Sequence, residues 1–175
     1  MNTRTPPIRY GTAVGLTVAL MACASAEPTQ APVDVAAESA AVSAVLDSLH
    51  YYASVPNGEA YFAFLAPDGV FIGTDATERW PVDEFRAYAL ARFDAGTGWT
   101  YVLREGTRHI TIGPGGDVAW FDELLDNENY GLTRGTGVLR RADGRWRIVQ
   151  YHLTIPVPNE LARDVVGMIR NLAGN

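Results

Sequence analysis

The chain has 175 residues, 47% of them apolar, and a formal net charge of −6 at pH 7. This length supplies one well-buried core but not two, so a single domain is expected. The arginines are scattered, which excludes nucleic acid as a partner because clustered basic residues supply most of that affinity. The absence of lysine excludes Schiff-base chemistry, and five serines that all lie at or before Ser54, with no G-x-S-x-G motif, argue against a serine hydrolase.

Residues 1–26 have the pattern of an export signal. Arg4 and Arg9 give a basic start, an apolar run follows over residues 13–22, and small residues come next. The run is too short to span a bilayer, which takes about 20 apolar residues. We therefore expect the segment to be removed from the mature protein.

Cleavage of this signal is predicted at one of two sites. Residues 20–23 resemble the lipobox of bacterial lipoproteins, which predicts a signal of residues 1–22 and a lipid on Cys23. Residues 24–26 instead fit the small-x-small pattern of ordinary signal peptidase, with cleavage before Glu27. With either cleavage we expect an exported protein of the bacterial cell envelope or periplasm, whose only membrane contact is the lipid. Cys23 is the only cysteine, so no disulfide can form within the chain.

Helices are predicted in the first half of the chain. Residues 27–37, rich in Pro, Ala and Thr, are expected to form a flexible tether, and residues 38–175 the folded domain. Apolar residues at helical spacing predict a helix over about 34–53, and turn residues separate it from a short helix over 59–65. A strand over 70–73 follows, and Pro81 is expected at the first position of a third helix that ends at Gly96.

Strands dominate the second half. From Trp99 onward the apolar period becomes two, which predicts strands over residues 99–104, 107–113, 117–126, 130–141 and 145–154. Asn159 is expected to cap a last helix with an apolar side formed by Leu161, Val165, Met168, Ile169 and Leu172. Helices followed by consecutive antiparallel strands indicate an α+β fold, with no βαβ alternation.

This order of elements and three segments resemble the SnoaL-like branch of the nuclear transport factor two-like superfamily. The segments are Gly73-Thr74-Asp75-x-x-Glu78-x-Trp80, the hairpin from Arg134 to Leu153, and Pro156-Val157-Pro158-Asn159. The resemblance covers roughly residues 38–160. It implies a cone in which a strongly curved antiparallel sheet wraps around about three helices and encloses a cavity, with a C-terminal helix and often a homodimer formed through the sheet. It implies no single activity, because such domains serve as isomerases, cyclases, hydrolases, dehydratases and binding or assembly modules.

The last hairpin suggests one wall of that cavity. A two-residue turn at Asp143-Gly144 would pair residue 139 with 148, 137 with 150 and 135 with 152. Gln150 and His152 would then face two glycines, whose missing side chains leave room for a pocket. The opposite face, with Thr136, Tyr151 and Leu153, would suit a dimer contact.

Two adjacent carboxylates interrupt an apolar strand, and alternation sends one to each face of the sheet. A tight turn at Glu128-Asn129 brings Asp122 level with His152, whereas a slip of one residue puts Glu123 there instead. A carboxylate in an apolar cavity can act as acid or base, and imidazole titrates near neutral pH. Asp122 and His152, with Glu123 if the register slips, are therefore the candidate catalytic residues. The alternative is a structural role, with the carboxylate paired to an arginine such as Arg134.

The expected ligand-binding residues are Gln150, Trp80 at the cavity mouth, Tyr52 on the first helix and Trp120. The three histidines show no metal-binding spacing, and the glycines of 135–137 lie inside a strand, so neither a metal nor another cofactor is expected. Three functions stay open. The first is binding of a small, largely apolar molecule with no reaction assignable. The second is an isomerase, cyclase or hydrolase that uses a carboxylate and His152, and the third is an assembly domain that dimerises without a ligand.

Overall fold

The computed structural model describes residues 1 and 32–173, and contacts between residues divide the chain after residue 31. The predicted export signal, both cleavage sites and Cys23 lie outside the described residues. Within the described part, no helix is long and apolar enough to cross a membrane. The first helix begins at Val35, so the last three residues of the predicted tether are helical.

Three helices form in the first half of the chain, as predicted. They are α1 (Val35–Ser54), α2 (Gly58–Ala63) and α3 (Val82–Asp94). The side chains of Asp34 and Asn57 cap the first two, because each accepts a hydrogen bond at 3.1 Å from a backbone N–H in the first turn. Pro81 is the N-cap of α3 and therefore lies one position before the predicted one.

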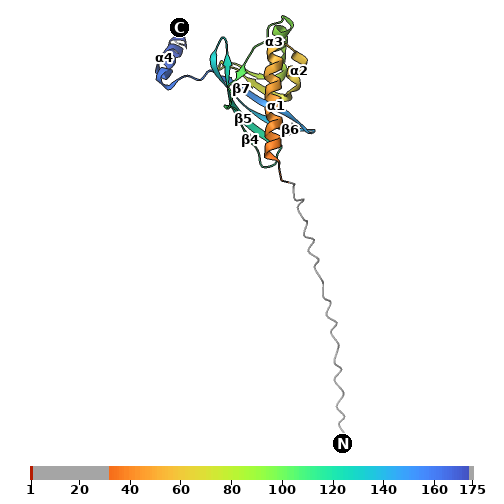
Figure 1. Cartoon of the computed structure of the whole chain (residues 1–175). Helices are drawn as coiled ribbons and strands as arrows, with labels where there is room; N and C mark the ends of the chain where they lie inside the picture. The colour runs from red at the N-terminus through yellow and green to blue at the C-terminus, as the bar shows by residue number, and fades with distance from the viewer. Residues whose placement is uncertain (2–31, 174–175) are drawn as a thin grey trace. The chain divides into compact units, whose positions relative to one another are not determined.

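The strands form one seven-stranded sheet with α1 along one of its faces (Figure 1). They are β1 (Leu65–Ile72), β2 (Arg79–Pro81), β3 (Val102–Leu103), β4 (His109–Ile112), β5 (Val118–Asn127), β6 (Gly131–Ala142) and β7 (Arg145–Thr154). The order is β2-β1-β7-β6-β5-β3, and β4 also pairs with β5. β1 runs parallel to β7, so the sheet is mixed and not purely antiparallel as predicted. β2 was not predicted from the sequence.

The register of the last hairpin agrees with the prediction only near its turn. Asp143 and Gly144 have φ of 52° and 72°, as a two-residue turn with two left-handed residues requires, and residue 139 pairs with 148. A β-bulge at Val149 then shifts the pairing, so that 138 pairs with 150 and 136 with 152. The predicted pairs 137–150 and 135–152 are therefore wrong. Gln150 and His152 face away from the helices, and the neighbouring Tyr151 and Leu153 are buried instead.

The register of β5 differs from the prediction by one residue. The loop between β5 and β6 contains three residues, 128–130, and Gly131 after it has a φ of 65°. Asp122 therefore pairs with Thr136, and Glu123 pairs with Gly135. This is the slip that was left open: Asp122 lies on the exposed outer face of the sheet, whereas the side chain of Glu123 is fully buried.

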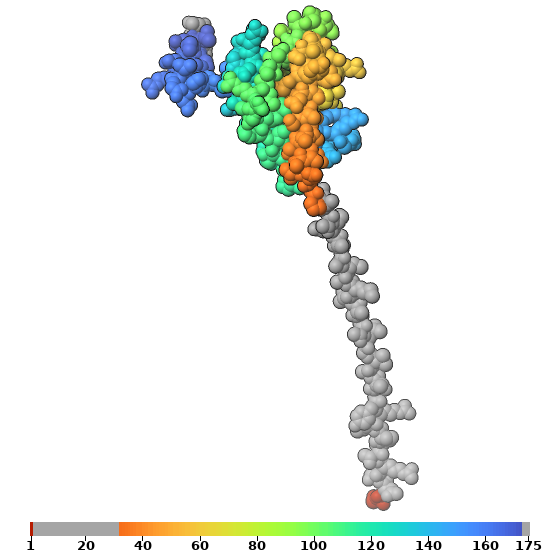
Figure 2. Space-filling model, viewed as in Figure 1, coloured from red at the N-terminus to blue at the C-terminus, as the bar shows by residue number. Residues whose placement is uncertain are grey.

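The hydrophobic core lies between the helices and the inner face of the sheet. Its fully buried side chains include Val42, Leu46, Phe85, Leu125, Leu139 and Ile148. In Figure 2, α1 (orange) lies across this face between the green strands on one side and the blue turn end of the β6–β7 hairpin on the other. Gly137 lies where the strands β5, β6 and β7 pack closely. A Cβ at this position would lie 2.3 Å from the carbonyl oxygen of Gln150 and 2.7 Å from the ring of Phe121.

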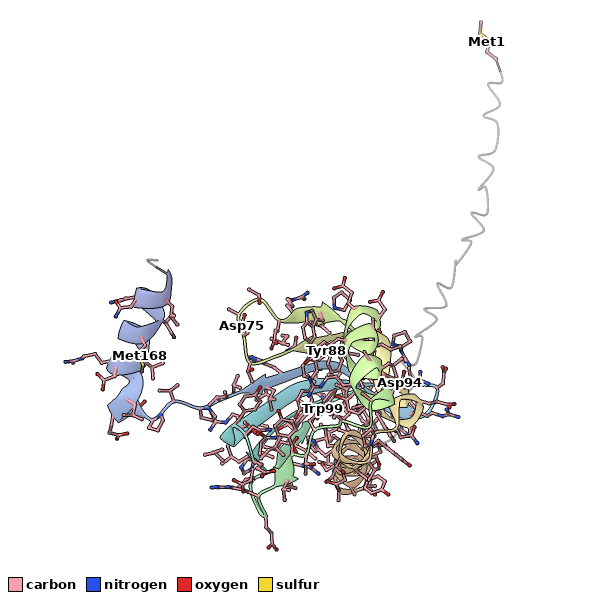
Figure 3. The ribbon with its side chains drawn as sticks, turned by 90° about the horizontal axis from the view of Figure 1, so that it is seen from above. Met1, Asp75, Tyr88, Asp94, Trp99 and Met168 are labelled. Carbon is pink, nitrogen blue, oxygen red and sulfur yellow. The ribbon has the colours of Figure 1, made fainter. Side chains whose placement is uncertain are left out.

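The last helical segment consists of a 3₁₀ turn, η1 (Asn159–Leu161), and α4 (Ala162–Ala173). The predicted helix is confirmed, but the residue before its first turn is Pro158, and Asn159 already belongs to that turn. Its apolar side chains are exposed, among them Leu161, Met168, Ile169 and Leu172 (Figure 3 labels Met168).

We predict that Gly137→Ala destabilises the domain by about 1–3 kcal/mol, because the added methyl group overpacks the contact between β5, β6 and β7. Urea unfolding followed by circular dichroism measures the change. Gly167→Ala is the matched control, since a Cβ at Gly167 meets nothing within 4 Å. A loss of stability in the control as large as in Gly137→Ala would contradict this account.

Candidate functional site

A cavity of about 390 Å³ opens between the helices and the inner face of the sheet. Its volume lies within the range of small-molecule sites. Aromatic side chains supply much of its wall: Trp80, Phe85, Tyr88, Trp99, Tyr101 and Tyr130. Figure 3 labels Tyr88 on α3 and Trp99 on the segment that follows it. The cavity can therefore surround a ring or a similar apolar group.

A buried carboxylate–histidine pair lies at the inner end of this cavity. His50 of α1 is one of the lining residues, and its Nε2 lies 2.7 Å from Oε1 of Glu123 on β5. The Glu123 side chain has no exposed surface, and that of His50 is 12% exposed. The histidine is thus the member of the pair that a ligand can reach.

A third side chain, Arg108, completes the cluster just before β4. Its Nε donates to Oε2 of Glu123 at 2.7 Å, and its Nη1 donates to Oδ1 of Asp47 at 2.6 Å and to the hydroxyl of Ser43 at 2.8 Å. The arginine side chain is only 7% exposed. In the described part of the chain, its Nη2 is the only buried side-chain polar atom without a hydrogen-bond partner.

The local sequence explains how these groups meet. Ser43, Asp47 and His50 are spaced by four and three residues, so they form a polar stripe along α1, beside the buried apolar stripe of the same helix. On the sheet, Gly135 leaves the space in which two polar groups approach each other. A Cβ at this position would lie 2.5 Å from the Tyr151 hydroxyl and 3.1 Å from Oε1 of Glu123.

Charge around Glu123 decides its protonation state. Burial raises the pKa of Glu123, but the hydrogen bonds and charges of His50 and Arg108 outweigh burial and leave this pKa below its usual value. Glu123 is therefore ionised at neutral pH and can only accept hydrogen bonds, so Nε2 of His50 carries the proton between them. The other ring nitrogen, Nδ1, is left free of this contact.

Tyrosine hydroxyls add further polar groups to the cavity wall. Burial, followed by the charge of Glu123, raises the pKa of Tyr151 well above its usual value, and burial also raises that of Tyr61. Burial and the charges of nearby groups raise the pKa of Tyr101 to about 12. All three hydroxyls are therefore protonated at neutral pH and can donate hydrogen bonds to a ligand oxygen. Among the residues described here, no group of three His, Cys, Asp or Glu side chains is arranged to hold a metal ion.

The structure brings only part of the predicted site together. Glu123 lies beside the cavity and Trp80 lines it. Asp122, Gln150 and Trp120 are exposed on the outer face, and His152 is half-buried there opposite Thr136. Tyr52 does not line the cavity, because its ring stacks on Phe64 at a centroid distance of 6.1 Å. The β-bulge and the longer β5–β6 loop account for the residues that face outward.

His50 and Arg108 were not predicted as site residues. The signal for His50 was its position on α1 next to the buried apolar stripe, which places its side chain at the edge of the core. Arg108 carries no such signal, because it lies in a short connection between strands.

A family model described as SnoaL-like domain matches residues 42–158 of this chain. The match covers most of the described residues, from α1 to the end of the segment after β7. The chain therefore belongs to the SnoaL-like domain family. No curated protein matches it.

Solved structures with the same fold agree with this assignment. A nuclear transport factor two-like protein of unknown function from Pseudomonas putida superposes with a TM-score of 0.57 at 20% identity, covering 71% of this chain and 90% of its own. A proposed ketosteroid isomerase from Shewanella frigidimarina has a TM-score of 0.52 at 25% identity, covering 65% of this chain and 94% of its own. A protein with a cystatin-like fold from Caulobacter vibrioides has a TM-score of 0.55 at 19% identity, covering 73% and 95%.

We predict that Glu123→Gln lowers the free energy of unfolding at pH 7 by about 3 kcal/mol, because it removes the buried partner of Arg108 and leaves this arginine with only the exposed Asp47 as its charge partner. The folded-state pKa of Glu123 is lowered, so its contribution is present above its ordinary value of 4.5 and is lost as the pH falls through the lowered one. The difference between variant and wild type should therefore shrink in acid. Urea unfolding from neutral pH down to about pH 3 measures it.

The control for this variant is Asp122→Asn, which changes the adjacent carboxylate on the exposed face of the same strand. It should change stability by less than about 0.5 kcal/mol. A pH-independent difference between Glu123→Gln and wild type would contradict an ionised Glu123 in the folded protein.

Proposed function

We propose that the cavity binds a small, largely apolar molecule and that His50, held by Glu123, transfers protons to and from it. The observation that carries this proposal is the 2.7 Å contact between a histidine that lines the cavity and a carboxylate with no exposed surface. A buried acceptor fixes the tautomer and orientation of the ring, which leaves the other ring nitrogen available for proton transfer.

The groups around His50 fit this chemistry. The protonated hydroxyl of Tyr151 lies close to the carboxylate on the same wall, where it can donate a hydrogen bond to a ligand oxygen that gains negative charge. Arg108 neutralises Glu123 from the side away from the ligand. Proton transfer at carbon, as in an isomerase, is the reaction class that such a base and donor support best, and the proposed ketosteroid isomerase among the solved structures has the same fold.

Binding without chemistry is the second candidate. The aromatic walls and the volume of about 390 Å³ favour it on their own, since they need no reactive group. The two candidate functions differ in what they require of His50. Catalysis needs the second ring nitrogen to exchange a proton, whereas binding needs only the ring as part of the cavity wall.

We predict that His50→Gln lowers the rate of proton exchange by about 10²–10⁴-fold and changes ligand affinity far less. The measurement first identifies a retained ligand by native mass spectrometry, then follows deuterium uptake from D₂O by NMR into that ligand and a panel of cyclic ketones. The exchange rate falls because a glutamine side chain can occupy the place of the imidazole ring but cannot accept and release a proton as the ring does.

His152→Gln is the matched control, because this second histidine lies on the outer face of the sheet. It should leave the exchange rate unchanged. Equal loss in both variants would contradict the assignment to His50, and binding without exchange in the wild type would favour the second candidate.

We also propose that the mature protein is exported to the bacterial envelope, on the basis of the basic start and the apolar run before Cys23. The mass of the mature protein from envelope fractions tests this. A lipid on residue 23, lost in Cys23→Ala, is expected for the lipoprotein, and an N-terminus at Glu27 for ordinary cleavage. Retention of residues 1–22 would contradict export.

The homodimer stays a prediction, but the surface through which it would form differs from the one expected from the sequence. Tyr151 and Leu153, expected at its interface, are buried inside the domain. The outer face of the sheet instead presents Trp120, and with it Val118 and Leu132, as exposed apolar side chains.

A further inference from the structure

The mouth of the cavity differs in chemistry from its inner end. Glu78, on the segment between β1 and β2, lines the cavity as a half-buried carboxylate. Its side chain packs on Gly73, where a Cβ would lie 2.1 Å from Oε2, and this oxygen accepts one hydrogen bond, from the backbone of Asp75 at 3.2 Å. Within residues 32–173 no arginine or histidine forms an ion pair with Glu78, although six such pairs occur elsewhere.

Aromatic rings line the cavity together with this carboxylate. The rings of Trp80 and Tyr88 lie 4.9 Å apart and tilted by 44°, so they form two sides of a corner. Tyr101 lies within the electrostatic influence of Glu78 and of Tyr88, which contribute to its raised pKa. Tyr130, which is 49% exposed, brings a fourth ring from the β5–β6 loop.

The loop that carries Tyr130 is held in place. The Asn127 side chain accepts hydrogen bonds at 3.0 Å from the backbone N–H groups of Asn129 and Tyr130, and its own amide donates to the carbonyl of Thr100 at 2.9 Å. The mouth is therefore fixed on both sides of Tyr101 before any ligand arrives.

The charges that line this end are two carboxylates, Glu78 and Glu128, and one guanidinium, Arg92. Arg92 is exposed, and its guanidinium lies 5.9 Å from the centre of the Tyr88 ring. The mouth thus already attracts one cation of the chain to an aromatic face. The faces of such rings attract cations, most strongly where water is excluded.

We propose that the ligand carries an ammonium or other organic cation, which binds at the mouth between Glu78 and the rings of Tyr88 and Tyr101. This inference rests on the proposed function, because it assigns one end of the molecule whose other end reaches His50. A cation supplies the charge partner that Glu78 lacks in the described chain. The rings of Tyr88 and Tyr101 offer it aromatic faces, and Arg92 is the basic group with which it competes at this end.

The test compares two probes of the same shape, benzyltrimethylammonium and neopentylbenzene, in which a carbon replaces the charged nitrogen. Binding to the mature domain is followed by NMR of the indole N–H signals. Four tryptophans give an internal control, since Trp80 and Trp99 line the cavity whereas Trp120 and Trp146 do not. We expect only the first two signals to shift, with the cation binding about tenfold more tightly.

Two variants are expected to change the affinity for the cation in opposite directions. Glu78→Gln keeps the shape and the acceptor for the Asp75 N–H, and it should weaken the cation about tenfold while leaving the neutral probe unchanged. Arg92→Gln removes the competing charge and should strengthen the cation severalfold, again without effect on the neutral probe. Tyr88→Phe, which keeps the ring, should bind the cation like the wild type.

Equal affinities of the two probes, or no effect of Glu78→Gln, would overturn the cation site but leave the proposed cavity in place. Shifts of Trp80 and Trp99 with neither probe, nor with the ketone panel, would overturn both proposals. Shifts confined to Trp120 would place binding on the outer face and overturn the assignment to the mouth.

Discussion

The structure depends on one buried charge, the carboxylate of Glu123. Removal of an ionised group from water costs several kcal/mol unless partners satisfy it. His50 and Arg108 each contact one of its oxygens at 2.7 Å, and Arg108 in turn contacts Asp47 on α1. The cluster thereby ties α1 to β5 and to the connection before β4. It also favours the observed register of β5, because a slip of one residue would turn Glu123 away from His50 and Arg108.

A buried ion cluster is weak support for stability, since apolar side chains of similar volume often stabilise a core at least as well. Its presence here makes physical sense through His50, the one member that lines the cavity. The positive charge of Arg108 pairs with the carboxylate, so Glu123 stays ionised although it is buried. The arrangement places a histidine ring of fixed tautomer on the wall of an aromatic cavity, which a purely apolar core could not do. Gly135 serves the same end, because any side chain there would collide with Tyr151 and Glu123.

Much of the fold could be predicted from the sequence, because it depends on strong local signals. The helical spacing of α1 and the Asp143-Gly144 turn both specify backbone conformation directly. The site could not be predicted so well, because alternation with period two turns each single-residue irregularity into an exchange of faces. Val149 is the bulged residue between Ile148 and Gln150, and nothing in a run of strand-forming residues marks it as such. The third residue of the β5–β6 loop had the same effect on Asp122 and Glu123.

The two ends of the cavity are built from different parts of the fold. The inner end uses side chains of α1, β5 and β7, whose positions follow from core packing and sheet register. The mouth uses Tyr88 of α3 together with the segment after β1, the residues around Tyr101 and the β5–β6 loop. The last three are connections and can vary in sequence without loss of the core. Under the proposed function, the reactive groups lie on helices and strands and most of the recognition groups lie on connections, an arrangement that accepts a ligand in one orientation. A molecule with one cationic end would bind with that end at Glu78. Its apolar end would then lie against His50, and the ligand could not contact the ionised Glu123 behind this histidine.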